Sequence, residues 1–210
     1  METARSLDRS FYAIITEPVV GYKQIAAVLV AYKVPFLQLR IKYADREIIK
    51  TTALTIREIT RHSCTKFIIN DDPYLALEVG ADGLHLGQED MSYAKARELV
   101  GSKMIIGLST HNVGQVLRAN ALQPDYIGMG PVFATPTKEK PDPVIGVEGL
   151  KAMLDVAKIP AVAIGGIDHT NLQAVLATGV GQFCAVRWLN QSRNEADLRK
   201  NLDIMSSYLI

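Results

Sequence analysis

The sequence predicts an α/β protein with a single compact (β/α)₈ barrel (a TIM barrel) of parallel strands, and three observations favour this class. Short runs of apolar and β-branched residues alternate with longer segments in which apolar residues recur at helical spacing. This alternation is typical of parallel strands joined by right-handed helical crossovers. Eight such units follow one another without a linker, which favours a closed barrel over an open doubly wound sheet.

The eight strands are expected at short apolar runs, with a helix after each of them. The strand segments are residues 11–16, 36–40, 66–70, 83–86, 104–108, 125–130, 161–164 and 182–186. The helical segments are residues 25–33, 46–60, 73–80, 93–100, 113–120, 147–157, 171–179 and 195–210. We therefore expect one domain over residues 1–210, in which residues 1–10 are an N-terminal extension.

One connection is longer than the rest. About 26 residues are available for each unit, fewer than in a typical barrel of roughly 250 residues, so insertions have little room. Residues 131–146 nevertheless form a Pro-rich stretch without periodicity after the sixth strand. Because such connections are uncommon in compact domains and often functional, we expect residues 134–145 to close over a site as a lid.

Composition excludes several classes of function. The chain has 23 Lys and Arg against 22 Asp and Glu, a net charge of +1, so no broad field attracts nucleic acid or an anionic membrane. No apolar run approaches the roughly 20 residues that span a bilayer. Glu2 and Asp8 precede the first apolar run, so the N-terminus matches neither a secretory signal nor a transit peptide. We expect a cytoplasmic protein without nucleic-acid or membrane partners, and its two cysteines, Cys64 and Cys184, as buried thiols.

Polar residues follow the second strand on one face. Leu37 and Leu39 share one face, and Gln38 and Arg40 share the other with Lys42 beyond them. If the apolar face meets the helices, Gln38, Arg40 and Lys42 point inward at the carboxyl end of the barrel. An equally open alternative is that the side chains of Arg40 and Lys42 point into solvent where the strand ends.

Carboxylates follow the third and fourth strands. Asp72 before Pro73 is typical of a helix cap, whereas Asn70 and Asp71 suit a hard cation. Asp90 is a second candidate carboxylate in the turn after the fourth strand. His85 lies on the inward face of that strand and is more typical of a satisfied core histidine than of a catalyst, and no second His is near it to indicate zinc.

Groups that can bind phosphate follow the later strands. Hydroxyl, lysine and glycine backbone groups bind phosphate oxygens, and they recur after the fifth to eighth strands at Ser109, Thr135–Lys138, Gly165–Gly166 and Val186–Arg187. All of these residues lie at carboxyl ends of strands, so we expect them to converge on one mouth. The combined set of two carboxylates, several cations and glycine backbone indicates Mg²⁺-assisted handling of a diphosphate and a second, separate phosphate.

Six motifs in order carry a family resemblance: QLRIK, INDD, DGLHLGQED, GLSTH, DYIGMGPVFATPTK and AIGGI. Together they cover nearly the whole chain and resemble the thiamine phosphate synthase family. The resemblance implies a transferase that joins 4-amino-5-hydroxymethyl-2-methylpyrimidine diphosphate to 4-methyl-5-(2-phosphoethyl)thiazole, releasing diphosphate. It further implies small-molecule substrates and a homo-oligomer.

The resemblance also implies roles for individual residues. Asp71 and Asp90 would hold Mg²⁺, and Arg40, Lys42, Ser109 and Lys138 would form the catalytic set. The pyrimidine diphosphate would be bound by Gln38, Leu39, Arg40, Ile41, Lys42, Asn70, Ser109 and Lys138. The thiazole phosphate would be bound by Thr135, Pro136, Thr137, Gly166, Val186 and Arg187.

The chain departs from the family pattern after the eighth strand, where small residues, often Ser, are usual and Val186, Arg187 and Trp188 stand here. Arg187 either adds a charge-assisted bond to the thiazole phosphate or turns outward, and we favour the direct contact. Two other functions stay open. A thiazole tautomerase shares the barrel but lacks the Asn-Asp pair and the later carboxylate, and a non-catalytic barrel that binds thiamine phosphate would have no use for the metal carboxylates.

Overall fold

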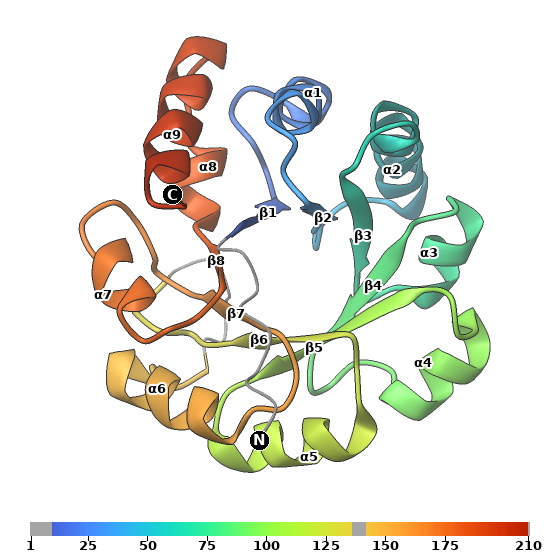
Figure 1. Ribbon diagram of the computed structural model, residues 1–210. Helices are drawn as coiled ribbons and strands as arrows, with labels where there is room; N and C mark the ends of the chain where they lie inside the picture. The colour runs from blue at the N-terminus through green and yellow to red at the C-terminus, as the bar shows by residue number, and fades with distance from the viewer. Residues whose placement is uncertain (1–9, 136–141, 210) are drawn as a thin grey trace.

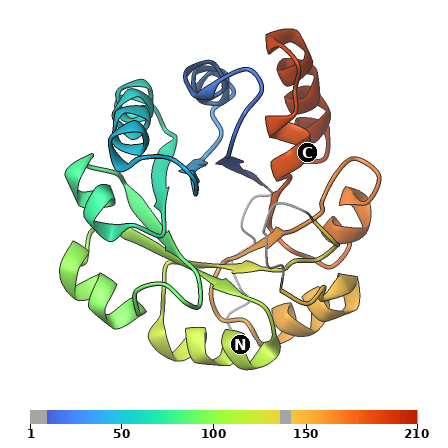
Figure 2. The same ribbon diagram turned by 180° about the vertical axis from the view of Figure 1, so that it is seen from behind.

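The computed structural model describes residues 10–135 and 142–209. Eight parallel strands close into a barrel in the order β1 to β8, and helices surround it (Figures 1 and 2). The predicted (β/α)₈ class is therefore confirmed. The strands are β1 (Ser10–Ile15), β2 (Phe36–Leu39), β3 (Lys66–Asn70), β4 (Gly83–Leu86), β5 (Ile105–Thr110), β6 (Tyr126–Met129), β7 (Ala161–Ile164) and β8 (Gln182–Cys184).

The helices form the outer layer of the barrel (Figure 1). They are α1 (Tyr22–Ala31), α2 (Arg46–Thr60), α3 (Pro73–Glu78), α4 (Tyr93–Val100), α5 (Val113–Leu122), α6 (Gly146–Val156), α7 (Leu172–Leu176), α8 (Val186–Asn190) and α9 (Glu195–Ser207). In the described part of the chain, no helix has the length and apolar character needed to cross a membrane.

Helix α8 was not expected from the sequence, and strand β8 is correspondingly shorter than predicted. The strand ends at Cys184, and Val186 begins the helix instead of ending the strand. Asn190 explains the difference, because its Nδ2 donates to the carbonyl of Ile14 at 2.8 Å and its Oδ1 accepts from the N–H of Thr16 at 2.9 Å. The helix thus joins the last strand to the first. At the other end, β1 begins at Ser10, one residue before the predicted start of this strand.

Apolar side chains fill two regions, one between strands and helices and one inside the barrel. Leu37 and Leu39 are buried in the outer region, as the strand parity predicted. Gln38 points the other way and is only 1% exposed. Cys184 lies inside the barrel, but Cys64 is exposed, so the prediction of two buried thiols was wrong for Cys64. Cys64 lies in the surface turn between α2 and β3.

The amino end of the barrel contains the same ion-pair arrangement twice. Asp82, just before β4, accepts from the N–H of Phe67 at 2.8 Å and from Arg57 of α2 at 3.0 Å. Asp125, just before β6, accepts from the N–H of Ile106 and from Arg97 of α4, both at 2.8 Å. Each carboxylate therefore ties a strand to its neighbour and to a covering helix.

The Asp82→Ala variant is expected to lower the free energy of unfolding by about 2 kcal/mol, because a buried N–H and a partly buried guanidinium lose a charged acceptor. Urea denaturation measures this change. Glu58→Ala is the matched control, since its pair with Arg61 joins side chains that are 73% and 54% exposed. Such exposed pairs contribute little. Equal effects of the two variants would contradict the structural role of Asp82.

Candidate active site

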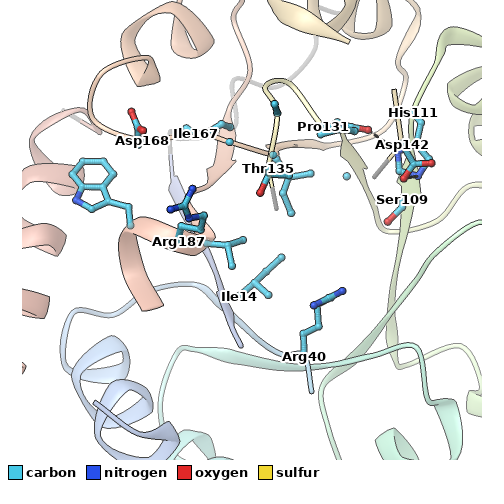
Figure 3. Close-up of a pocket in the computed structure, with 18 of the residues that line it drawn as sticks. Ile14, Arg40, Ser109, His111, Pro131, Thr135, Asp142, Ile167, Asp168 and Arg187 are labelled. Atoms are coloured by element: carbon cyan, nitrogen blue, oxygen red, sulfur yellow. Dashed lines mark hydrogen bonds and ion pairs between the residues drawn. The ribbon is translucent and has the colours of Figure 1, made fainter. Parts of the chain in front are cut away.

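A cavity of about 390 Å³ opens at the carboxyl ends of the strands. The residues after β2, β5, β6, β7 and β8 all contribute to its wall (Figure 3). Predicted site residues that line it are Arg40, Ser109, Thr135, Gly166, Val186 and Arg187. The structure thus brings together groups that are separated by up to about 150 residues in the sequence. Pro136, Thr137 and Lys138, and half of the predicted lid (residues 136–141), lie outside the described residues.

Two arginines lie on different sides of this cavity (Figure 3). Arg40 directly follows β2, and among the described residues its guanidinium has no acidic or hydrogen-bonding partner. Arg187 lies in α8 near Asp168, and after the hydrogen bonds from Thr170 its charge contributes to the lowered pKa of Asp168. Burying a cation without an anion is unfavourable, so a half-buried Arg40 indicates that the cavity takes an anionic ligand.

The turn after β7 is held against the connection that follows β6. The N–H groups of Val132 and Phe133 donate to the carbonyls of Ile164 and Gly165, each at 2.9 Å. Gly165 and Gly166 have φ values of 103° and 62°, in the region that favours glycine. Gly166 and Thr135 therefore lie on one wall of the cavity, in the part of a barrel where phosphate groups are commonly bound.

The two predicted carboxylates are in contact with each other. Asp71 follows β3 with a φ of 67°, and its N–H donates to the carbonyl of His85 at 2.8 Å. Lys42 forms an ion pair with Asp71. Asp90 accepts from the N–H of Gly87 at 2.7 Å, and burial, followed by its contact with Asp71, raises the pKa of Asp90.

This donor set fits one kind of metal ion. Two adjacent carboxylates repel each other, and a divalent cation between them would relieve that repulsion. In the described part of the chain, no three His, Cys, Asp or Glu side chains gather. Mg²⁺ is usually held by one or two carboxylates together with water and substrate phosphate oxygens, so Asp71 and Asp90 are sufficient for it.

The remaining predicted residues in the described part of the chain do not line the cavity. Asn70 ends β3, where it is paired in register with His85. Gln38 is buried inside the barrel and donates to the Tyr12 hydroxyl at 3.0 Å. Leu39 and Ile41 both pack against the outer core, so their side chains face the helices. Asp72, as predicted, caps a helix: it accepts from the N–H of Leu75 at 2.9 Å, with Pro at the start of α3.

Sequence reasoning missed three residues at this site. His111 lines the cavity; its Nδ1 donates to the carbonyl of Gly130 at 2.6 Å, and its Nε2 lies 3.4 Å from Asp142. Asp142 belongs to the long Pro-rich connection, so the sequence contained no periodic signal for this pair. Gln88 donates to the carbonyl of Ser109 at 2.6 Å. Its place in the same turn as Asp90 is the one signal that could have identified it.

The fold and the site together define a (β/α)₈ barrel with a cavity at the carboxyl ends of its strands, lined by arginine, hydroxyl and glycine groups of the kind that bind phosphate. The family model described as thiamine monophosphate synthase matches residues 11–189. The chain belongs to this family of transferases.

Individual relatives agree with this assignment. A thiamine-phosphate synthase of Gloeobacter violaceus is 42% identical over 174 residues, which make up 83% of this chain and about half (51%) of that protein. One of Caldicellulosiruptor bescii is 39% identical over 89% of this chain and 84% of its own length. The solved thiamine phosphate pyrophosphorylase of Pyrococcus furiosus has a TM-score of 0.82 at 31% identity, covering 98% of this chain and 96% of that one.

Proposed function

We propose that the cavity carries out the family's reaction, joining the pyrimidine diphosphate to the thiazole phosphate to give thiamine phosphate and diphosphate. One observation carries the proposal: a carboxylate pair follows β3 and β4, while Arg40, whose guanidinium has no partner among the described residues, follows β2 and lines the cavity together with Arg187 of α8. A metal-bound diphosphate and a second phosphate need these groups in separate places.

The first substrate is assigned to the side of the mouth formed by β2 to β5. Arg40, Lys42 and Lys138 offset the charge of the diphosphate, and the Ser109 hydroxyl donates to it. Asn70 and the segment from Gln38 to Lys42, including Leu39 and Ile41, complete this subsite. Leu39 and Ile41 contribute only their backbone, because their side chains pack outward.

Asp71 and Asp90 are assigned to Mg²⁺. When bound, the ion stabilises the negative charge that develops on the departing diphosphate. Lys42 forms an ion pair with Asp71, which places this lysine beside the proposed metal site, where it would offset charge on the diphosphate.

The second substrate is assigned to the wall formed by β6 to β8. Thr135, Pro136, Thr137 and Gly166 surround its phosphate, with backbone contacts from Val186 and a charged contact from Arg187. Asp168 lies next to Arg187 and would repel a phosphate. The positive charge of Arg187 offsets the charge of Asp168 at this wall. A phosphate could then lie here, and this supports a direct contact between Arg187 and the thiazole phosphate.

The reaction follows from this placement. The carbon–oxygen bond to the diphosphate breaks, the electron pair leaves with the diphosphate, and the aminopyrimidine ring stabilises the cationic methylene. The thiazole nitrogen then adds its lone pair to that carbon. The residues orient two substrates and stabilise leaving-group charge, and no proton has to be removed.

Release of diphosphate by the purified chain tests the proposal. We expect release only when both substrates and Mg²⁺ are present. Conversion of the thiazole alone would indicate a tautomerase, and tight binding of thiamine phosphate without turnover would indicate a binding barrel. Both results would overturn the proposal. The cytoplasmic location and a homo-oligomeric state belong to the same proposal.

The Arg187→Ser variant tests the second subsite. We expect the KM for the thiazole phosphate to rise by about tenfold, the effect of losing one charge-assisted hydrogen bond, while the KM for the pyrimidine diphosphate stays the same. Initial rates measured at varied concentrations of each substrate separate the two constants. An unchanged KM for the thiazole phosphate would show that Arg187 makes no direct contact.

A further inference from the structure

A chain of hydrogen bonds inside the barrel ends at the proposed active site. Gln38 Nε2 donates to the Tyr12 hydroxyl at 3.0 Å, and that hydroxyl lies 2.6 Å from the hydroxyl of Tyr126. The Tyr126 hydroxyl lies 2.9 Å from Nδ1 of His85, whose Nε2 lies 3.0 Å from the Ser109 hydroxyl. Five strands (β1, β2, β4, β5 and β6) therefore contribute side chains to a series of hydrogen bonds that leads from the barrel interior to its mouth.

Gln38, the first residue of this hydrogen-bond series, determines which group donates and which accepts at each later hydrogen bond. The amide nitrogen of Gln38 can only donate, so the Tyr12 hydroxyl accepts from it and has one proton left to donate. Burial raises the pKa of Tyr12 and Tyr126 above the ordinary range for tyrosine, so both phenols keep their protons. Among the described residues, Gln38 and Tyr126 are the hydrogen-bond partners of the Tyr12 hydroxyl. Tyr12 therefore donates to Tyr126.

The same reasoning assigns the protons of Tyr126 and of the His85 imidazole. The Tyr126 hydroxyl accepts from Tyr12, so its own proton is donated to Nδ1 of His85. A histidine that accepts at Nδ1 carries its proton on Nε2. His85 Nε2 then donates to the Ser109 hydroxyl. The opposite direction would leave Tyr12 with two donors and its own proton without an acceptor in the described part of the chain.

We infer that His85 is a positioning residue that, together with Tyr126, Tyr12 and Gln38, orients the Ser109 hydroxyl as a donor into the cavity. Ser109 lines that cavity, its carbonyl is held by Gln88, and its hydroxyl oxygen accepts from His85. Its proton is thereby left for an acceptor on the ligand. A phosphate oxygen accepts such a proton, whereas an ammonium or amide N–H group at this position would meet a competing donor.

The tautomer of His85 tests the direction of the chain without any assumption about the reaction. The protein has four histidines, so ring nitrogens can be resolved by ¹H–¹⁵N correlation spectroscopy of the full ¹⁵N-histidine-labelled chain. At a pH of about 8, above the ordinary imidazole pKa of roughly 6.5, we expect His85 to be protonated on Nε2 alone. Protonation on Nδ1 would overturn the inference.

Variants connect the tautomer with the hydroxyl. Tyr126→Phe keeps the ring but removes the hydroxyl that donates to His85, so we expect a mixture of both tautomers. Tyr93→Phe is the matched control, because the Tyr93 hydroxyl donates to the carbonyl of Gln123 on the outer surface. The control should leave the His85 signals unchanged. An unchanged His85 tautomer in Tyr126→Phe would also overturn the inference.

Kinetics then test the consequence for the ligand, and this step alone rests on the proposed function. When Ser109 is retained, we expect Tyr126→Phe to lower kcat by about tenfold, with the KM for the thiazole phosphate unchanged. In Ser109→Ala the hydroxyl is absent, so adding Tyr126→Phe should lower kcat no further. Additive losses would show that Tyr126 acts independently of Ser109. A chain without synthase activity would contradict the proposed function, and the tautomer would still decide the direction of the hydrogen bonds.

Discussion

Replacement of Asp71 by Asn is expected to lower kcat/KM for diphosphate release by about 100-fold or more, because loss of metal-assisted charge stabilisation removes several kcal/mol from the transition state. Asn keeps the size of the side chain and its backbone conformation, which Asn tolerates as well as Asp does. Asp90→Asn should act in the same direction. Initial rates at increasing Mg²⁺ concentration measure the effect, and the variants should need far more Mg²⁺ for half-maximal rate.

The neighbouring Asp72 provides the matched control. It caps α3 and pairs with Arg46 at 2.7 Å, so Asp72→Ala should lower the free energy of unfolding by about 1 kcal/mol. Its Mg²⁺ dependence and kcat/KM should match those of the unaltered chain. Wild-type Mg²⁺ dependence in Asp71→Asn would remove the assignment of Asp71 to the metal.

Replacement of Gly165 by Ala is expected to lower the free energy of unfolding by about 3 kcal/mol or more, through steric overlap combined with backbone strain. A Cβ at Gly165 would lie 2.5 Å from both Cα and Cβ of Pro131. The overlap would separate the connection after β6 from the end of β7, where Val132 and Phe133 are hydrogen-bonded. Urea denaturation measures the stability, and the KM for the thiazole phosphate should rise in parallel.

Gly179→Ala isolates the steric part of this effect. Gly179 also has a positive φ, 88°, but a Cβ there would meet nothing within 4 Å. The control should therefore cost only the strain of a left-handed alanine, about 1 kcal/mol. Equal losses in both variants would show that the close approach at Pro131 has no energetic role.

Features that depend on local periodicity were predictable from the sequence. Alternation within the second strand placed Leu37 and Leu39 toward the helices and Gln38 inside the barrel, as observed. The cap at Asp72 was equally local, because it requires only an acceptor three residues before the N–H of Leu75. Parallel strands then placed Arg40, Ser109 and Gly166 at one mouth, since all of them follow carboxyl ends.

Features that depend on distant partners were not predictable. Helix α8 is held by Asn190 contacts with Ile14 and Thr16, which are more than 170 residues away. His111 meets Asp142 on a segment with no periodicity. His85 was interpreted as a satisfied core histidine, and both of its ring nitrogens do have partners. Its connection to Ser109 depends on Tyr126 and Tyr12, whose hydroxyls a sequence cannot orient.

The two aspartate–arginine ion pairs at the amino end of the barrel affect how the sequence of this protein can evolve. Asp82 and Asp125 tie strands to helices at the end opposite the cavity. Selection for tolerance of heat can therefore act on one end of the strands while selection for substrate acts on the other. Substitutions around these two aspartates can therefore change the stability of the protein during evolution without changing the residues of the active site.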